Sequence, residues 1–390
     1  MSKILYITHT NPNNDSRVLK VLEAGLHGGN ICLSLGIQRG QKVPESEYSY
    51  SVTSVSKIFL NFYFKKKKRF VIINLFLNVI IWTEIFLKIL IRGWKFNPEI
   101  IHCHDWFMLP VAALLKIVCR TKLIYDAHEL ESECQGMPRS LKFLARTTES
   151  RLWSRVDVFI TVSKSIETWY LNKYGNKKSL IVFNSPQILS ESFEVGNQDI
   201  YDLRKIFSVS ARSKIYLYSG RLTAGRGIDI ILKSFLSVNS DAVLVFLGEG
   251  PLIAEIEDLS EKHSNIFYHP SVAHNIVVEV ARSADFGLCL IEDASLSDYY
   301  CLPNKLFEYA FANLPIIASN LPEIKNLVTE YSLGQCISNN EKELTRMIEV
   351  NDLQQSELKK PLNKSLFEFS WEKQEQTLIK LYTSILIKDF

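Results

Sequence analysis

Short apolar runs rich in β-branched residues alternate with helical patterns along most of the chain, and this alternation restricts the fold more than any other feature. The strand candidates are residues 3–8, 31–35, 100–103, 123–125 and 158–162, then, after a polar stretch at 185–199, residues 215–218, 242–247, 266–268, 286–291 and 316–319. Strands separated by helices pair in parallel, with helices on both faces. The sequence therefore predicts an α/β protein of two doubly wound Rossmann-like domains that face a central cleft, where the carboxyl ends of the strands bind the ligand.

The length and composition fit two folded domains and exclude several classes of protein. Of the 390 residues, 47% are hydrophobic and 22% are charged, and the net charge of +3 does not indicate a nucleic-acid partner. The 7 cysteines are scattered without a Cys-x-x-Cys pair, which argues against a disulfide framework or a zinc knuckle. The first residues run directly into a strand pattern without a leader, so we expect a cytoplasmic protein.

Residues 65–92 break the alternation with a basic cluster, residues 65–69, followed by an apolar run over residues 70–91. The run is nominally long enough to span a bilayer, which takes about 20 residues, but a span here would cut the first sheet in two. Its polar residues gather within about 120° of a helix: Asn74, Asn78, Glu84, Lys88 and Arg92. An amphipathic helix beside a basic cluster favours peripheral adsorption to an anionic membrane surface. A core helix preceded by a solvated basic loop is the alternative.

A loop rich in glycine and arginine, Ser219-Gly-Arg-Leu-Thr-Ala-Gly-Arg-Gly227, follows the first strand of the second half. Arg221 and Arg226 could clamp a diphosphate through forked, charge-assisted hydrogen bonds, and sugar transfer needs such neutralisation of its leaving group. The next strand ends at Gly248 and Gly250, where missing side chains would let a nucleotide approach the backbone. Each feature has a plain alternative: a glycine turn with solvent-exposed arginines, and an ordinary strand-to-helix turn.

A third loop opens a helix with Pro303-Asn304-Lys305-Leu306. Proline is tolerated in the first turn of a helix, and the free amides there, together with Lys305, could bind an anion. One turn later, Glu308 could accept hydrogen bonds from ribose hydroxyls. The three loops together predict a nucleotide site in the second domain.

Taken in order, these motifs resemble those of family-four retaining glycosyltransferases. The resemblance rests on Gly220-Arg221-Leu222 with Arg226-Gly227, Gly248-Glu249-Gly250-Pro251, Lys305-Leu306-Phe307-Glu308-Tyr309 and Leu314 to Ser319, and in the first half on Asn14 to Leu19, Ile101 to Asp105 and Tyr125 to Glu129. It covers almost the whole chain. It implies the glycosyltransferase B fold, with an acceptor-binding domain over residues 1–185, a nucleotide-sugar-binding domain over 186–368, and a helix over 369–390 that returns to the first domain.

The resemblance also implies roles for particular residues. Arg221 and Arg226 would hold the donor diphosphate, Glu308 would bind the ribose, and His128 would face the transferred sugar. The implied donor site is completed by Gly220, Gly248, Gly250, Asn304, Lys305 and Leu306. The sequence departs from the family at Tyr300, which stands where the first glutamate of a paired-glutamate motif is expected. The carboxylate that usually contacts the sugar is therefore unplaced.

The expected chemistry follows from the same resemblance. It implies retention of the anomeric configuration, with a UDP-sugar as the first expectation for the donor and a GDP-sugar as the second. No Asp-x-Asp motif occurs, and His102 and His104 have no third ligand at a recognisable spacing, so we expect neither a metal site nor a cofactor. The expected acceptor is a lipid-linked or growing glycan of a bacterial capsule, O-antigen or exopolysaccharide, reached at the inner face of the cell membrane.

Other functions remain as alternatives. A nucleotide-sugar 2-epimerase would share the architecture and also bind a diphosphate, and a catalytically silent partner subunit would fit the departure at Tyr300. A dinucleotide oxidoreductase is disfavoured, because the loop after the first strand, residues 9–15, contains no glycine.

Overall fold

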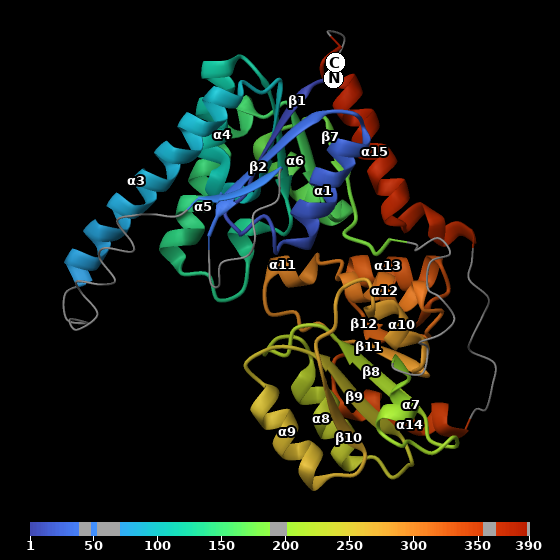
Figure 1. The fold of residues 1–390 in the computed structure, drawn as a ribbon. Coiled ribbons are helices and arrows are strands. Elements are labelled where there is room, and N and C mark those ends of the chain that lie inside the picture. The colour runs from blue at the N-terminus through green and yellow to red at the C-terminus, as the bar shows by residue number, and fades with distance from the viewer. Residues whose placement is uncertain (39–47, 53–70, 188–200, 354–363, 388–390) are drawn as a thin grey trace.

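The computed structural model describes residues 1–38, 48–52, 71–187, 201–353 and 364–387, which form two α/β domains (Figure 1). The first domain contains β1 (Lys3–Ile7), α1 (Ser16–His27), β2 (Ile31–Ile37), β3 (Ser49–Val52), α3 (Val71–Phe96), β4 (Ile100–His104), α4 (Asp105–Cys119), β5 (Lys122–Ala127), η1 (Glu131–Glu133), α5 (Arg139–Leu152), η2 (Trp153–Arg155), β6 (Val158–Thr161), α6 (Lys164–Tyr174) and β7 (Ser179–Ile181). The second contains α7 (Leu203–Ile206), β8 (Ile215–Ser219), α8 (Ile228–Ser237), β9 (Val243–Gly248), α9 (Ile253–Lys262), β10 (Ile266–Pro270), α10 (Val277–Arg282), β11 (Phe286–Cys289), α11 (Leu296–Tyr299), α12 (Asn304–Phe311), β12 (Ile316–Ser319), α13 (Pro322–Glu330), β13 (Gly334–Ile337) and α14 (Glu341–Leu353). The chain continues through η4 (Lys364–Phe369) and α15 (Trp371–Ser384).

Both sheets have the doubly wound order that the sequence predicts. The strands pair in parallel as β3-β2-β1-β4-β5-β6-β7 in the first domain and β10-β9-β8-β11-β12-β13 in the second. In each sheet the chain starts in the middle, winds to one edge, returns past its first strand and winds to the other edge. Such a reversal opens a crevice at the carboxyl ends of the central strands. The two-domain Rossmann-like prediction is therefore confirmed.

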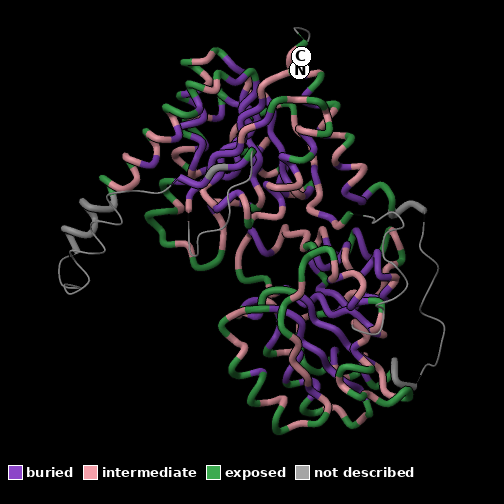
Figure 2. Tube along the Cα trace, in the orientation of Figure 1, coloured by how far each residue is buried: buried purple, intermediate pink, exposed green. Residues whose placement is uncertain are grey.

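Helices bury both faces of the first sheet. On one face, Leu5 and Cys103 pack in a cluster with Ile89 of α3 and Leu115 of α4. On the other face, the cluster around Tyr6 includes side chains of α1 and α15. Figure 2 shows that the buried residues of both domains follow the strands. Burial of strands on both sides explains why they read as continuous apolar runs in the sequence.

The C-terminal helix α15 lies against α1 of the first domain (Figure 1). Trp371 at its start is fully buried, and its backbone N–H donates to the Pro186 carbonyl over 3.2 Å. The Gln374 side chain accepts from the Phe183 backbone N–H over 3.2 Å. These bonds join α15 to the interdomain segment that contains Phe183 and Pro186. They thereby hold this segment against the first domain.

The short helix α11 connects the domains on the other side of the crevice. The Leu130 backbone N–H donates to Ser297 Oγ over 3.2 Å, and the Ser163 hydroxyl donates to the Tyr300 carbonyl over 2.9 Å. The Tyr300 side chain packs against the apolar cluster of the first domain. The crevice is thus closed at one edge by direct contact between the domains.

Helix α3 packs on the core along one side, as the core-helix interpretation of residues 65–92 expects, and the basic cluster at 65–69 lies outside the described residues. One side of the helix packs on the core through Ile85 and Ile89, which are 3% and 0% exposed. At about 100° per residue, a second, exposed side carries an apolar stripe, which we call the α3 stripe: Val79, Ile80, Leu87, Ile91 and Trp94, which are 39–57% exposed. Within the described residues, no helix is both long enough and apolar enough to cross a membrane.

Candidate functional site

A cavity of about 440 Å³ lies between the domains, and residues of both contribute to its wall. From the first domain and the linking segment these are Asp15, Arg17, His128, Glu129, Val162, Ile166, Phe183 and Asn184. From the second domain they are Tyr218, Ser219, Gly220, Arg221, Arg226, His274, Ile291, Ser297, Asp298, Cys301, Leu302, Pro303, Asn304, Lys305, Phe307 and Glu308. The cavity lies beside the end of β8, where the strand order of the second sheet reverses.

The structure brings most of the predicted site residues together in this cavity. Its wall includes His128, Gly220, Arg221, Arg226, Asn304, Lys305 and Glu308, and it does not include Gly248, Gly250 or Leu306. Leu306 is fully buried in the apolar core of the second domain. Arg17, Phe183 and Asp298 are wall residues to which the sequence analysis gave no role.

Gly248 and Gly250 let the loop at residues 219–227, which we call the arginine loop, pack closely against the backbone after β9. A Cβ at position 248 would lie 1.8 Å from the Gly220 carbonyl oxygen, and one at position 250 would lie 2.1 Å from the Leu222 carbonyl oxygen. The Leu222 backbone N–H donates to the Glu249 carbonyl over 2.7 Å. The space that the sequence analysis left open for a nucleotide is therefore occupied by the backbone of the arginine loop.

We expect Gly248→Ala to lower the free energy of unfolding by about 1–3 kcal/mol, because the backbone there has φ +155° and a methyl group would collide with Gly220. Gly29→Ala is the matched control, since Gly29 also has a positive φ, +73°, but nothing within 4 Å of an added Cβ. The control is expected to cost only about 1 kcal/mol. Urea denaturation measures both, and equal losses would contradict the packing role of Gly248.

Lys305 is a buried lysine that forms no ion pair with any of the described residues. Its side chain enters the cavity from the first turn of α12, the residue is 8% exposed, and Nζ has no hydrogen-bond partner among the described residues. Nζ lies 3.6 Å from the centre of the Tyr218 ring, a cation–π contact that partly compensates for its burial. A buried ammonium costs free energy unless it is paired. An anion entering the cavity would supply the missing partner.

Arg226 and Asp298 lie close together in the wall of the cavity. The guanidinium is 3.9 Å from Asp298 Oδ1, and Asp298 Oδ2 accepts from the Ser295 hydroxyl over 2.6 Å. Tyr300, two residues later, lines a separate pocket with Trp169 of α6. Tyr300, at the position of the missing glutamate, thus points toward the first domain. Asp298 is the carboxylate that α11 supplies to the cavity.

Glu308 lies one turn after Lys305 on the same wall. The Ser219 hydroxyl donates to Glu308 Oε2 over 3.4 Å. Burial raises the pKa of this carboxyl group, and Lys305 and Lys20 oppose the rise. Among the described residues this carboxyl group accepts no other hydrogen bond, so its oxygens remain available to the hydroxyl groups of a ligand.

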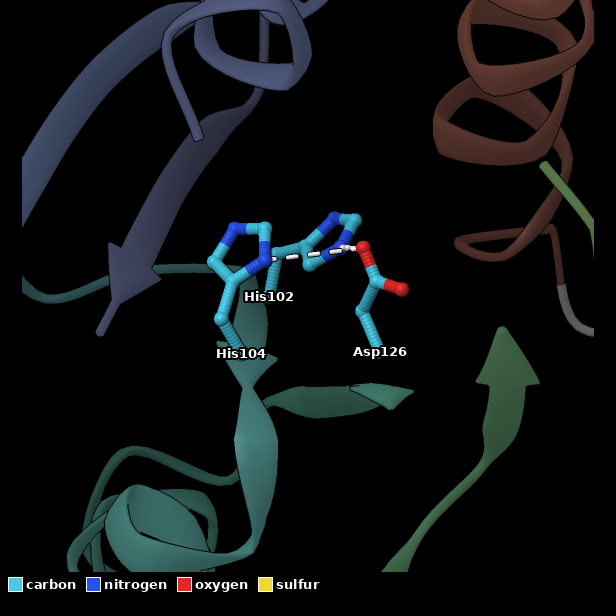
Figure 3. Close-up of side chains that lie close together, drawn as sticks. All are labelled: His102, His104 and Asp126. Carbon is cyan, nitrogen blue, oxygen red and sulfur yellow. Dashed lines mark hydrogen bonds and ion pairs between the residues drawn. The ribbon is translucent and has the colours of Figure 1, made fainter. Parts of the chain in front are cut away.

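The structure places a carboxylate, Asp126, beside His102 and His104. His102 and His104 of β4 lie beside Asp126 of β5, and their ligand atoms are within 4.8 Å of one another (Figure 3). The register of the two strands pairs His104 with Asp126. No spacing in the sequence could reveal Asp126 as a third group, because the pairing of neighbouring parallel strands joins residues that are distant in sequence.

The geometry of this cluster nevertheless favours hydrogen bonding over metal coordination. Both Asp126 oxygens already accept from the Arg17 guanidinium, over 3.1 Å and 2.7 Å, and a cation would compete for the same lone pairs. The rings of His102 and His104 are stacked at 4.7 Å with an interplanar angle of 19°. Their nearest nitrogens, His102 Nε2 and His104 Nδ1, already lie 3.3 Å and 3.5 Å from the same Asp126 oxygen, as hydrogen-bond donors to a carboxylate would.

Two doubly wound parallel-sheet domains with a cationic cavity between them define a protein of the glycosyltransferase B fold. The family model described as Glycosyltransferase Family 4 matches residues 55–184, and the one described as Glycosyl transferases group 1 matches residues 213–350. The chain therefore belongs to the family-four, group 1 glycosyltransferases.

Individual relatives agree with this assignment. An uncharacterised glycosyltransferase of Methanocaldococcus jannaschii is 24% identical over 59% of this chain and 58% of its own length. The chitobiosyldiphosphodolichol beta-mannosyltransferase of Kluyveromyces lactis is 24% identical over 57% of this chain and 56% of its own length. The match thus spans less than three fifths of these relatives. The Anabaena HepE structure in complex with UDP-glucose has the same fold, with a TM-score of 0.69 and 14% identity over 98% of this chain and 100% of HepE.

Proposed function

We propose that this protein transfers a sugar, with retention and without a metal, from a nucleotide-diphosphate sugar to a lipid-linked or growing glycan at the cytoplasmic membrane surface. UDP is the preferred nucleotide, since HepE is described in complex with UDP-glucose, and GDP is the second candidate. A dolichol-linked acceptor in the name of the K. lactis relative supports the lipid-linked class. Bacterial capsule, O-antigen or exopolysaccharide assembly is the setting in which we place the reaction.

The observation that carries this proposal is the group of cations in the cavity. Lys305 Nζ is buried and lacks a hydrogen-bond partner among the described residues, and Arg221 and Arg226 line the same cavity. Their charges could neutralise the diphosphate that leaves when the sugar is transferred, which is the electrostatic need that a metal meets elsewhere. Glu308 would accept hydrogen bonds from the ribose, and His128 would lie on the opposite wall beside the sugar.

A transfer assay tests the reaction. Nucleotide sugars with a labelled sugar are incubated with the protein, EDTA and bacterial membrane lipid extract, and the label is followed into the organic phase. We expect label transfer that Glu308→Gln reduces, and an anomeric proton coupling in the product that matches the donor. Release of free nucleotide with an isomerised sugar would instead indicate the epimerase, and nucleotide binding without turnover would indicate a silent partner subunit.

Membrane association is supported by the α3 stripe, which presents apolar side chains to solvent next to a cationic one. Leu87, Ile91 and Trp94 are 50%, 49% and 57% exposed, and at about 100° per residue the exposed Lys95 lies beside the stripe. Apolar groups that enter the lipid interface beside basic groups attracted to anionic headgroups give reversible adsorption.

We expect Leu87→Ser, Ile91→Ser and Trp94→Ser together to weaken binding to vesicles of anionic phospholipid about tenfold or more. Co-sedimentation at low and high salt measures the partition. The matched control places three serines on the exposed surface of the second domain, at Ile206, Leu236 and Val350, which are 38–43% exposed. Equal binding by the wild type and the α3 variant would contradict membrane adsorption through this helix.

A further inference from the structure

A chain of buried polar groups runs from the wall of the cavity into the first domain. His104 Nδ1 lies 2.9 Å from His128 Nε2 and 3.5 Å from Asp126 Oδ2. His102 Nε2 lies 3.3 Å from the same Asp126 oxygen, and its Nδ1 lies 2.9 Å from the Tyr382 hydroxyl of α15. His102, His104 and Asp126 are completely buried, and only His128 reaches the cavity.

The charge of Asp126 fixes the direction of the hydrogen bonds in this chain. Burial alone would raise its pKa, but Arg17 and the hydrogen bonds from His102 and His104 outweigh burial and hold the pKa well below the usual range. Burial also lowers the pKa of His102 to about 4. Asp126 is therefore a carboxylate that can only accept, and His102 is neutral, with Nε2–H donating to Asp126 and Nδ1 accepting from Tyr382.

The contacts of the His104 ring place its proton on Nδ1. With the proton on Nε2, a buried N–H would have no acceptor among the described residues, and the Nδ1 lone pair would face the Asp126 carboxylate at 3.5 Å. With the proton on Nδ1, the N–H points between Asp126 Oδ2 and His128 Nε2. The second arrangement avoids both an unsatisfied donor and the repulsion between lone pair and carboxylate.

The tautomer of His128 then follows from His104. Burial lowers the pKa of His128, and the opposing effects of Asp105 and Asp126 do not reverse this, so the ring is neutral. Its Nε2 accepts from His104, which leaves the proton on Nδ1, 3.7 Å from Asp105 Oδ1. The same Asp105 oxygen accepts from the His128 backbone N–H over 3.4 Å, which fixes the loop after β5.

We propose that His104 is a positioning residue, which donates from Nδ1 to His128 Nε2 and holds His128 as a neutral, Nδ1-protonated wall of the sugar site. The role in transfer rests on the proposed function, whereas the tautomer does not. In this arrangement His128 Nε2 is not free to take a proton from an acceptor hydroxyl. His128 therefore acts by shape and by its fixed ring orientation, without serving as a general base.

Nitrogen NMR of the full-length protein with 15N-labelled histidine tests the tautomer directly, in the absence of any substrate. Long-range proton–nitrogen spectra near neutral pH, with His128→Gln for assignment, are expected to show His128 protonated at Nδ1 and bare at Nε2. A His128 signal protonated at Nε2 would overturn the proposal. In His104→Asn, the amide nitrogen replaces the Nδ1 donor, and we expect His128 to keep the Nδ1-protonated tautomer. In His104→Leu, the donor is lost, and we expect His128 to show a mixture of both tautomers.

The effect on transfer is a separate measurement. We expect His104→Leu to lower kcat roughly 10²-fold, the scale of a misplaced reacting geometry, with little change in the donor KM, and His104→Asn to recover most of the loss. Equal losses in both variants, with the His128 tautomer unchanged, would overturn the positioning role. If the wild type transfers no sugar, the proposed function fails, and the NMR result still decides the tautomer.

Discussion

Replacing Asp126 by alanine is expected to lower the free energy of unfolding by about 3–5 kcal/mol, because it leaves a buried arginine without its counter-charge. Arg17 is 3% exposed, and its guanidinium donates to both Asp126 oxygens and, over 2.9 Å, to the Val182 carbonyl. Urea denaturation near neutral pH measures the loss. A loss below about 1 kcal/mol, the range of exposed ion pairs, would contradict the structure of this cluster.

Two comparisons separate the charge effect from simple loss of packing. The double variant Arg17→Met with Asp126→Leu removes both charges and is expected to recover a large part of the loss. Because the pKa of folded Asp126 is held below its unfolded value, its contribution is present above about pH 4 and is lost as the pH falls toward the folded pKa. The wild type should therefore lose this share of stability in acid, and Asp126→Ala should not.

Replacing Lys305 by methionine is expected to change stability and binding in opposite directions. The unliganded protein should gain about 1–2 kcal/mol, because a buried ammonium without a hydrogen-bond partner among the described residues is removed. Nucleotide binding should lose roughly 1.5–3 kcal/mol, the value of a hydrogen bond to a charged group, or about 10- to 150-fold in Kd. Urea denaturation and calorimetric titration with UDP measure the two effects.

Lys325→Met is the control, since Lys325 is an exposed lysine on the neighbouring helix α13. It should alter neither quantity by more than about 0.5 kcal/mol. A Lys305→Met protein that is less stable than the wild type and binds UDP equally well would mean that Lys305 has a structural role and does not contact the nucleotide.

The strand alternation predicted the fold well because most strands are buried on both faces. β8 and β9 have only buried residues, and the sequence marked both within about one residue. The strands that the sequence analysis did not identify, β3, β7 and β13, lie at the sheet edges. β7 has only three half-buried residues, so its sequence carries too little apolar signal to stand out.

The cationic loops were predictable because each is local in sequence, whereas the histidine network is not. Arg221 and Arg226 lie in the loop between β8 and α8, and Lys305 lies directly after the proline that opens α12. His104 and Asp126 meet only through the register of β4 and β5, and Tyr382 reaches His102 only because α15 returns to the first domain. The orientation of Tyr300 toward α6 likewise depends on contact between the domains, which no local pattern encodes.

Thermal stabilisation of the purified protein by UDP, GDP, dTDP and CDP sugars, with EDTA present, tests the proposed donor site most directly. We expect one nucleotide to raise the Tm, and the rise to disappear in Arg221→Ala and Glu308→Ala, because ligands that bind only the folded state stabilise it. No change in Tm with any of the sugars, in protein shown to be folded, would contradict a nucleotide-sugar site between the two domains.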